Sequence, residues 1–325
     1  MRYWVQLATE QFPPSALVRQ AVAAERAGFD AVNVSDHFQP WWEPGESAHA
    51  WALLGAIGNA TESVGLGTGV TAPVFRHNPA TVAQFIATIE EMCPRRAFLG
   101  IGSGESLNES PCGMDWPPVA EQIERMEEAL GIIGRLLDGE RVDHEGRFFR
   151  TKAADLHTRG ERRPPVYVSA FGPQAAAVAG RLGDGVWTMG DPEMAPDVIE
   201  AYRAACDDAG REPGEVILQA GFSWADDDDA ALEGARVWKS TQVPDYFTDD
   251  WHDPKAMYGK GEREISDEDF KESYIVSADP EHHVERIREI EQLGATVVCL
   301  QNGSGSAPER ALEIYGESVL PALTG

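Results

Sequence analysis

The chain has 325 residues, of which 42% are hydrophobic and 25% charged, so it carries enough apolar material for a large buried core. Its formal net charge of −27 argues against nucleic acids and anionic membranes as partners, because phosphate groups are bound by clustered basic residues. No apolar run approaches the ~20 residues of a membrane-spanning helix, and the N-terminus enters a strand-like pattern at once, which predicts a soluble, cytoplasmic protein with no membrane partner.

Strand-like and helix-like segments alternate along almost the whole chain. Short apolar runs predict strands at residues 3–8, 31–35, 64–67, 97–102, 166–169, 185–188, 216–220 and 296–300. Amphipathic segments between them predict helices at residues 15–27, 79–92, 119–137, 192–209, 280–293 and 307–323. Start and stop signals support these helices, since Pro79 opens one and Gly28 follows another.

Eight strand–helix units in an unbroken series predict a (β/α)8 TIM barrel of the α/β class. An open doubly wound sheet is the alternative, but residues 9–14 after the first strand contain no glycine-rich dinucleotide fingerprint. We expect a single domain over residues 1–325. Three segments exceed a minimal barrel, at residues 103–118, 141–150 and 238–273. The second predicts a hairpin, and long insertions at barrel loops usually form lids or substrate walls.

The charge and the cysteines bear on the environment of the protein. The positive charge comes mainly from arginine, whereas acidic runs such as residues 226–229 add to the negative excess. An acidic, lysine-poor surface is typical of halophilic, archaeal-type proteins, whose saline cytoplasm screens the self-repulsion. An ordinary acidic protein from a low-salt organism is the alternative. The four cysteines are scattered without a C-x-x-C pair, so we expect reduced thiols and no metal site.

Polar side chains follow the predicted strands at the point where each strand ends. In a parallel barrel these positions converge on one mouth, where ligands bind. Residues 35–41 follow the second strand and supply Asp36, His37 and Trp41. The ends of the other strands add Glu10, Gly69, Val70, Ser103, Gly104, Glu105, Asn108, Ala170, Phe171, Gly172, Gln174, Thr188 and Asp191. Each could be purely structural, but together they predict one shared site.

The residue types at this mouth indicate hydride transfer. Histidine can take or give the proton of a substrate hydroxyl near neutral pH, which suits His37. A carboxylate enclosed in a loop, such as Glu105, can handle a second proton at a raised pKa, and Trp41 offers an aromatic face to a substrate. Backbone N–H groups at the helix start within residues 169–174 form a phosphate cradle. The combination predicts a redox enzyme with a phosphate-bearing cofactor.

Four ordered motifs resemble the coenzyme F420-dependent branch of the luciferase-like oxidoreductase family, and the similarity runs from Tyr3 to Leu320. They are SDHFQPW at residues 35–41, GTGVTAP at 67–73, FRHNP at 75–79 and GSGESLNE at 102–109. Within that branch the chain is similar to F420-dependent glucose-6-phosphate dehydrogenases and F420-dependent secondary alcohol dehydrogenases. The resemblance implies a TIM barrel, F420 as cofactor, a small hydroxylated substrate and a homodimer.

The resemblance also implies individual roles. His37 would be the base that takes the hydroxyl proton, Trp41 would help to hold the product, Glu105 would serve the proton at the deazaflavin N1, and Glu10 would be a nearby acid. Contacts to the deazaflavin and its phosphate-bearing chain would come from Asp36, Ser103, Gly104, Asn108, Ala170, Phe171, Gly172, Gln174 and Ala175. Gly69 and Val70 match the position of a non-prolyl cis peptide that backs the ring in this family.

Two positions depart from the relatives that act on glucose 6-phosphate. Asp191 stands where they carry a lysine, and Ser273 where they carry an arginine, while a third phosphate-binding lysine falls near Lys260. Replacing a cation with Asp191 opposes a sugar phosphate through both charge and geometry. We therefore expect a neutral alcohol, sugar or related hydroxylated substrate in a pocket that includes Thr188, Asp191 and Ser273.

Two alternatives stay open. An FMN-dependent luciferase-like monooxygenase would use the same barrel for oxygen chemistry, and a non-catalytic protein could use it only to carry a cofactor. The combination of His37, Trp41 and Glu105 favours the dehydrogenase.

Overall fold

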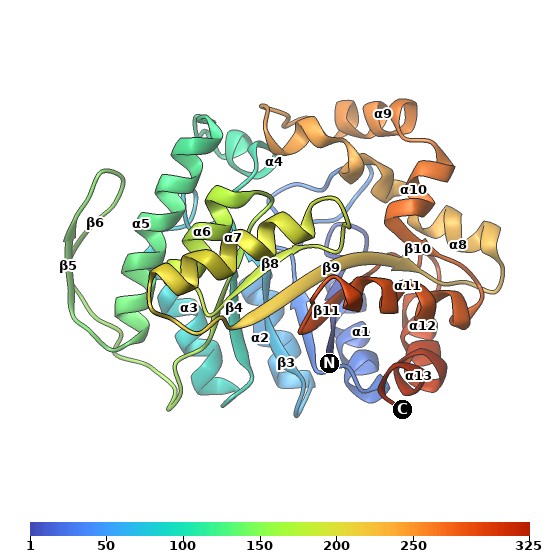
Figure 1. Ribbon diagram of the computed structural model, residues 1–325, viewed down its shortest axis with the longest axis horizontal. Helices are drawn as coiled ribbons and strands as arrows, with labels where there is room; N and C mark the ends of the chain where they lie inside the picture. The colour runs from blue at the N-terminus through green and yellow to red at the C-terminus, as the bar shows by residue number, and fades with distance from the viewer.

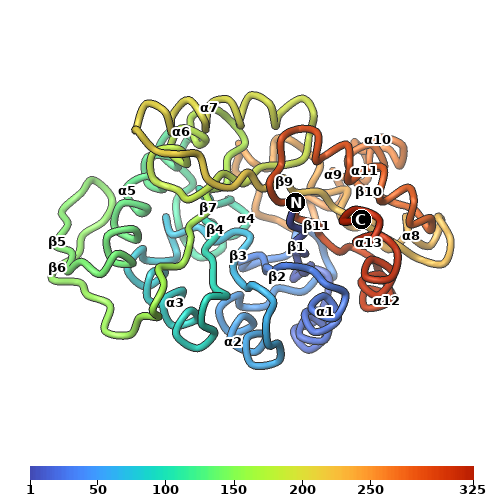
Figure 2. Tube along the Cα trace, turned by 60° about the horizontal axis from the view of Figure 1, so that its bottom comes forward, coloured from blue at the N-terminus to red at the C-terminus, as the bar shows by residue number.

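The computed structural model describes residues 1–325 and contains a closed barrel of parallel strands surrounded by helices (Figures 1 and 2). Eight strands follow one another around the barrel in chain order: β1 (Arg2–Leu7), β2 (Ala31–Val34), β3 (Gly65–Thr71), β4 (Ala97–Ile101), β7 (Val166–Ser169), β8 (Gly185–Met189), β9 (Glu215–Ser223) and β11 (Val297–Asn302). The pairing of β11 with β1 closes the ring, and a short strand, β10 (Tyr274–Val276), pairs with the end of β9. The predicted (β/α)8 barrel is therefore confirmed.

Aromatic rings fill the N-terminal half of the barrel interior. Trp4 stacks on Phe98 with ring centroids 4.5 Å apart, and Tyr167 and Trp187 lie within 6 Å of Trp4 on its other sides. All four side chains are buried. Because this end of the barrel is packed, a ligand can reach the interior only from the C-terminal ends of the strands.

The barrel helices follow from apolar faces and from clear end signals. They are α1 (Pro14–Ala27), α2 (Ala50–Ala60), α3 (Pro79–Met92), α5 (Val119–Leu137), α6 (Pro173–Leu182), α7 (Ala195–Asp208), α11 (Pro280–Gln292), α12 (Pro308–Ile314) and α13 (Leu320–Thr324). The bounds of α3 and α5 match the predicted ones. α1 ends where Gly28 takes the left-handed conformation, at φ 94°.

Three helical features differ from the prediction. α2 was not foreseen, because its sequence is apolar on all sides and shows no polar face. α7 begins at Ala195 and not at residue 192, because the Asp191 carboxylate accepts hydrogen bonds from the N–H groups of Glu193 and Met194 and makes a turn there. The predicted final helix is divided into α12, a π-helical turn (Tyr315–Val319) and α13.

The three predicted insertions are present but more ordered than expected. The first contains α4 (Ser106–Glu109) and a 3-10 turn (Ser110–Cys112). The second is a hairpin of β5 (Val142–Glu145) and β6 (Arg150–Ala154), which ends four residues later than predicted and projects from the barrel in Figure 1. The third is mostly helical, with 3-10 segments at Arg236–Gln242 and Pro244–Phe247 followed by α9 (Pro254–Glu264) and α10 (Asp267–Ser273), while α8 (Asp228–Ala235) precedes it.

The first and third insertions lie together over the C-terminal ends of the strands (Figure 1). The Ser106 hydroxyl of α4 donates to the Trp251 carbonyl oxygen and accepts from the Trp251 N–H, both at 2.8 Å. None of the helices has the length and apolar character that crossing a bilayer would require. The four cysteines are free thiols, as predicted.

Candidate active site

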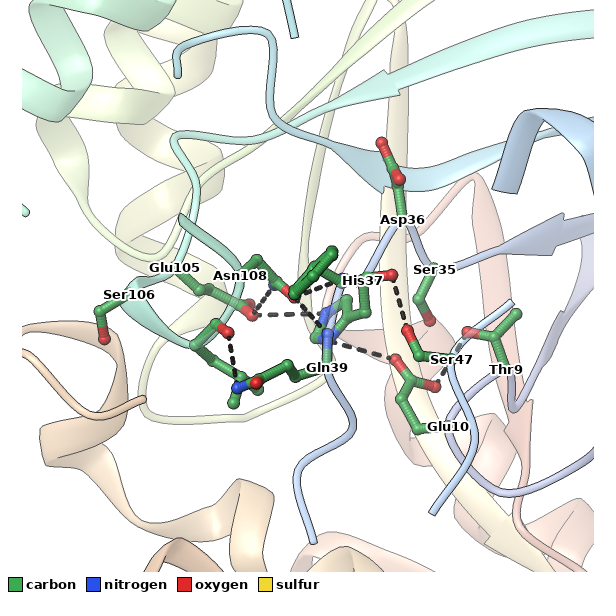
Figure 3. A network of polar contacts seen from close by, with 12 residues as sticks. Thr9, Glu10, Ser35, Asp36, His37, Gln39, Ser47, Glu105, Ser106 and Asn108 are labelled. Carbon is green, nitrogen blue, oxygen red and sulfur yellow. Dashed lines mark hydrogen bonds and ion pairs between the residues drawn. The ribbon is translucent and has the colours of Figure 1, made fainter. Parts of the chain in front are cut away.

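Glu10, His37 and Glu105 meet at the mouth of the barrel, although they come from three different loops (Figure 3). Nδ1 of His37 lies 3.5 Å from Glu10 Oε1, and Nε2 lies 3.3 Å from Glu105 Oε2. The side chain of Glu10 is 1% exposed, that of His37 12% and that of Glu105 23%. The imidazole is therefore held between two carboxylates, and Glu105 is the one that faces the solvent side.

Short hydrogen-bonded loops hold the two carboxylates in place. Glu10 Oε2 accepts from the hydroxyl of Thr9 at 3.1 Å. Glu105 Oε2 accepts from Asn108 Nδ2 at 3.2 Å, and Asn108 Oδ1 accepts from the N–H of Phe38 at 2.8 Å. Asn108 thus links α4 to the segment that carries His37, as Figure 3 shows.

The electrostatics of the site give Glu105 the character of a proton donor. Burial raises the pKa of the Glu105 carboxyl, the charge of His37 opposes this shift, and the negative charge of Glu10 adds to it. Glu105 therefore keeps its proton to a higher pH than an exposed glutamate does. A carboxyl of this kind beside an imidazole is suited to general acid–base work.

Aromatic side chains form one wall next to His37. The Trp41 ring is buried and lies 5.6 Å from the imidazole. Tyr246 and Phe247, from the third insertion, pack against Trp41 with centroid distances of 6.3 and 5.6 Å. Phe247 also contacts the exposed Phe171 at 5.4 Å. The third insertion therefore packs aromatic side chains beside the predicted catalytic residues.

Asp36 is buried, and its carboxylate points away from His37 and Glu105 (Figure 3). It accepts hydrogen bonds from Thr71 and Arg76 and lies 3.0 Å from His77 Nε2. Burial opposes ionisation, but the hydrogen bond from His77 and the charge of Arg76 hold the pKa of Asp36 well below its usual range. Arg76 and His77 lie within a motif noted in the sequence, but nothing in their spacing indicated that they would reach Asp36.

Residues predicted to hold a cofactor line the mouth around the histidine. The Gly69–Val70 peptide is cis, as the resemblance implied, and the pairing of β3 with β4 shifts register between Thr68 and Thr71, which makes a bulge there. A side chain at Gly69 would come within 2.2 Å of Asn33 Oδ1. Gly104 takes φ +94°, which lets the chain turn before Glu105. Ser103 is half-buried beside it.

The segment from Ala170 to Ala175 leads into α6, which begins at Pro173. The first backbone hydrogen bond at the start of this helix runs from the N–H of Ala176 to the Gly172 carbonyl oxygen. The N–H groups of Gln174 and Ala175 precede that bond and so have no helical partner. The position of a Cβ on Gly172 has nothing within 4 Å, and Phe171 is 45% exposed. An open space thus lies in front of a helix N-terminus, which is a favourable place for a phosphate.

The three residues predicted for the substrate pocket have different surroundings. Thr188 is buried, with its hydroxyl 3.7 Å from the sulfur of Met194. Asp191 is exposed and caps the turn before α7, and Ser273 is exposed and donates to the Phe270 carbonyl oxygen. Lys260 is paired with Asp245 at 2.6 Å and lies over the Trp251 ring. No unpaired cation is therefore contributed by these four positions.

Comparison with known proteins gives one family over nearly the whole chain. A profile of the luciferase-like monooxygenase family matches residues 1–297. F420-dependent glucose-6-phosphate dehydrogenases of Microbacterium testaceum and Nakamurella multipartita are each 38% identical over 99% of this chain, covering 97% and 96% of their own lengths.

Solved structures agree with the sequence comparison. An F420-dependent secondary alcohol dehydrogenase in complex with an F420–acetone adduct superposes with a TM-score of 0.94 at 32% identity, covering 99% of both chains. A coenzyme F420-dependent tetrahydromethanopterin reductase from Methanopyrus kandleri has a TM-score of 0.83 at 23% identity over 99% of both chains. The monooxygenase RslO1 from Streptomyces bottropensis has a TM-score of 0.78 at 22% identity, also over 99% of both chains. The last two likenesses show the shared fold alone.

Proposed function

The chain belongs to the luciferase-like monooxygenase family, and from that membership we propose that it is a coenzyme F420-dependent dehydrogenase acting on a hydroxylated small molecule. One observation carries the proposal: the His37 imidazole lies between Glu10 and Glu105 at the mouth of the barrel, at the end where β7 leads into the N-terminus of α6. The arrangement provides a base, a proton donor and a phosphate-binding helix end around one space.

The residues present fit coenzyme F420. The N–H groups of Gln174 and Ala175, with open space at Gly172, would bind the phosphate, and Ser103 and Asn108 would contact the ribityl chain. The Gly69–Val70 bulge would back the ring. When bound, the deazaflavin supplies the carbon that exchanges a hydride with the carbinol carbon of the substrate.

The chain's own side chains would move the protons. Nδ1 of His37 has no hydrogen-bond partner, and it lies 3.5 Å from the almost fully buried Glu10, which orients the imidazole. Nε2 lies on the side of Glu105 and accepts the proton of the substrate hydroxyl. Glu105 holds a second proton at its carboxyl and supplies it to the cofactor side of the site. Trp41 shapes the space for the carbon skeleton of the substrate.

Charge at the mouth favours a neutral substrate. Asp191 and Ser273 contribute no cation, and the ammonium of Lys260 is engaged by Asp245. A phosphate group on the substrate would therefore lack the partners that it needs to leave water. We infer a neutral alcohol, sugar or related metabolite, with glucose 6-phosphate a poor substrate.

An FMN-dependent monooxygenase function is less well supported, because the three relatives above 30% identity named in the comparison are F420-dependent dehydrogenases. Titration of the purified protein with F420 and with FMN separates the two functions. We expect saturable F420 binding, followed by loss of oxidised F420 absorbance when an alcohol is added. Tight FMN binding without F420 binding would overturn the proposal, and F420 binding without turnover of any alcohol or sugar would favour a non-catalytic carrier.

The setting of the enzyme is also a proposal. The net charge of −27 and the scarcity of lysine support a saline, archaeal-type cytoplasm, so activity should be assayed across a range of KCl concentrations. We further infer that the whole chain acts as one barrel domain and that two chains form a homodimer. Light scattering at high salt tests the dimer, and a mass of about 35 kDa in solution would contradict it.

A further inference from the structure

We propose that Arg76 is a positioning residue that holds His37 and Glu105 at their working distance by joining the two segments that carry them. Arg76 follows β3, and no role for it was evident from the sequence. The inference rests on the proposed function where it concerns turnover. The structural part stands on contacts within the chain and can be tested without any cofactor.

Arg76 binds two buried acids at once. Its Nε donates to Glu109 Oε1 at 3.3 Å, and its backbone N–H donates to Glu109 Oε2 at 3.1 Å. On its other side, Nη1 donates to Asp36 Oδ1 at 3.2 Å, and Nη2 donates to the Asp36 carbonyl oxygen. The Arg76 side chain is only 12% exposed, so these contacts are largely shielded from water.

The two acids occupy informative places in the chain. Asp36 directly precedes His37. Glu109 is the last residue of α4, and the residue that caps the start of this one-turn helix is Glu105, whose carbonyl oxygen accepts from the N–H of Glu109 at 3.2 Å. A displacement of Glu109 is therefore passed on to Glu105 through a single helical turn. Asn108 makes the second connection between the same two segments, through Glu105 and Phe38.

Charge explains why this bridge needs a cation. The Glu109 side chain is 0% exposed, and both of its hydrogen-bond donors belong to Arg76. Asp36 keeps Thr71 and His77 when the Arg76 side chain is replaced, but Glu109 keeps only the backbone N–H of residue 76 and loses its cationic partner. A buried carboxylate that has lost its neutralising cation is strongly disfavoured, so α4 is expected to move until Glu109 reaches water or takes up a proton.

Lysine cannot replace this arginine fully. The planar guanidinium reaches Glu109 through one edge and Asp36 through the other, whereas an ammonium is a point charge on a flexible chain. Arg76→Lys should therefore preserve the charge balance but not the bridge. Arg76→Gln removes both. The pair separates the contribution of charge from that of geometry.

The test uses Arg76→Lys, Arg76→Gln and the double variant Arg76→Gln/Glu109→Gln, which leaves two neutral amides if Arg76→Gln alone does not fold. Arg162→Gln is the matched control. Arg162 also pairs with a buried glutamate, Glu90, at 3.3 Å, but at the opposite end of the barrel next to the start of β4. The Arg162→Gln substitution should lower the free energy of unfolding without changing the arrangement of His37 and Glu105.

The first readout is the imidazole 15N resonances of His37 in the apo protein, assigned by their loss in His37→Gln. We expect them to move in all three Arg76 variants toward their position in Glu105→Gln, and to stay unchanged in Arg162→Gln. The second is turnover with F420 and the best alcohol. We expect kcat to fall roughly 10- to 100-fold in Arg76→Lys, since small misplacement of catalytic groups has effects of that size, with KM changed less.

Wild-type His37 resonances and wild-type kcat in folded Arg76 variants would overturn the inference, as would equal resonance shifts in Arg162→Gln. If the wild-type protein does not turn over any alcohol with F420, the proposed function fails. The His37 resonances would in that case still decide whether Arg76 positions the histidine against Glu105.

Discussion

Nε2 of His37 lies 3.3 Å from Glu105 Oε2, while Nδ1 of the same ring lies 3.5 Å from Glu10 Oε1. The two carboxylates differ in kind. Glu10 is almost fully enclosed and bonded to Thr9, whereas Glu105 is partly open and bonded to Asn108. One acid can therefore orient the base permanently, while the other can exchange its proton during the reaction.

Replacing His37 tests the base directly. His37→Gln should reduce kcat by roughly 100- to 10,000-fold, which is the usual effect of losing a positioned general base. F420 affinity should change little, because the proposed role of the imidazole is toward the substrate and not the cofactor. Steady-state kinetics and a binding titration measure the two quantities. The control is His144→Gln, which alters a histidine bound to Glu128 near the projecting hairpin and should leave both unchanged.

The raised pKa of Glu105 predicts a pH dependence. In the proposed mechanism alcohol oxidation uses the protonated Glu105 carboxyl, so kcat should decline on the alkaline side as Glu105 loses its proton, at a higher pH than for an exposed glutamate. Glu105→Gln should lower kcat and remove this decline. A pH profile of kcat for both proteins makes the comparison. An unchanged alkaline limb in Glu105→Gln would assign that limb to another group.

The start of α6 can be tested by adding charge. Gly172 has an extended backbone, with φ −168°, and open space where a Cβ would lie, so Gly172→Asp should fold normally. The new carboxylate would repel a phosphate at the helix N-terminus, and the dissociation constant for F420 should rise about tenfold or more. Gly172→Asn is the matched neutral control. Equal affinity of both variants and the wild type would place the phosphate elsewhere.

Ser273 offers a test of the substrate preference. Ser273→Arg adds a cation at an exposed position, and it should lower KM for a sugar phosphate while affecting a neutral alcohol little. Ser273→Gln adds comparable bulk without the charge. Efficient turnover of glucose 6-phosphate by the unaltered chain would contradict the inference of a neutral substrate.

His283 predicts how stability depends on pH. It is buried between the Tyr315 hydroxyl and the Ser277 carbonyl oxygen, and burial lowers its pKa to about 4. Because the unfolded chain binds this proton with a pKa near 6.5 and the folded chain only with a pKa of about 4, stability is lost as pH falls from 6.5 towards 4, by about 3 kcal/mol in total. Denaturant unfolding of the wild type and of His283→Gln across this range measures the difference, which should shrink as the pH falls.

The sequence allowed the barrel and its main helices to be predicted, because parallel strands covered on both faces appear as apolar runs and amphipathic helices repeat at their own period. The predicted bounds of α3 and α5 match the structure. α2 was not predicted, because a helix that is apolar on all sides lacks the amphipathic pattern on which the prediction relies. The predicted catalytic residues converge because they follow strands that end at the same mouth.

The support behind the site could not be predicted in the same way. Asp36 and Arg76 are 40 residues apart and lie on different loops, so their contact depends on how two strands pair and on how α4 folds back. Single residues such as Thr188 and Asp191 likewise take their surroundings from neighbouring side chains. Periodicity carries no information about such encounters.

The aromatic packing of Trp4, Phe98, Tyr167 and Trp187 affects the order in which ligands can bind and leave. Because these rings fill the N-terminal end of the barrel, cofactor and substrate must both enter through its C-terminal opening. The reactant that sits deeper has to enter first and leave last. Substitutions in the loops around this opening can accordingly alter which substrates enter. The aromatic packing at the other end stabilises the pairing of the strands independently of those loops.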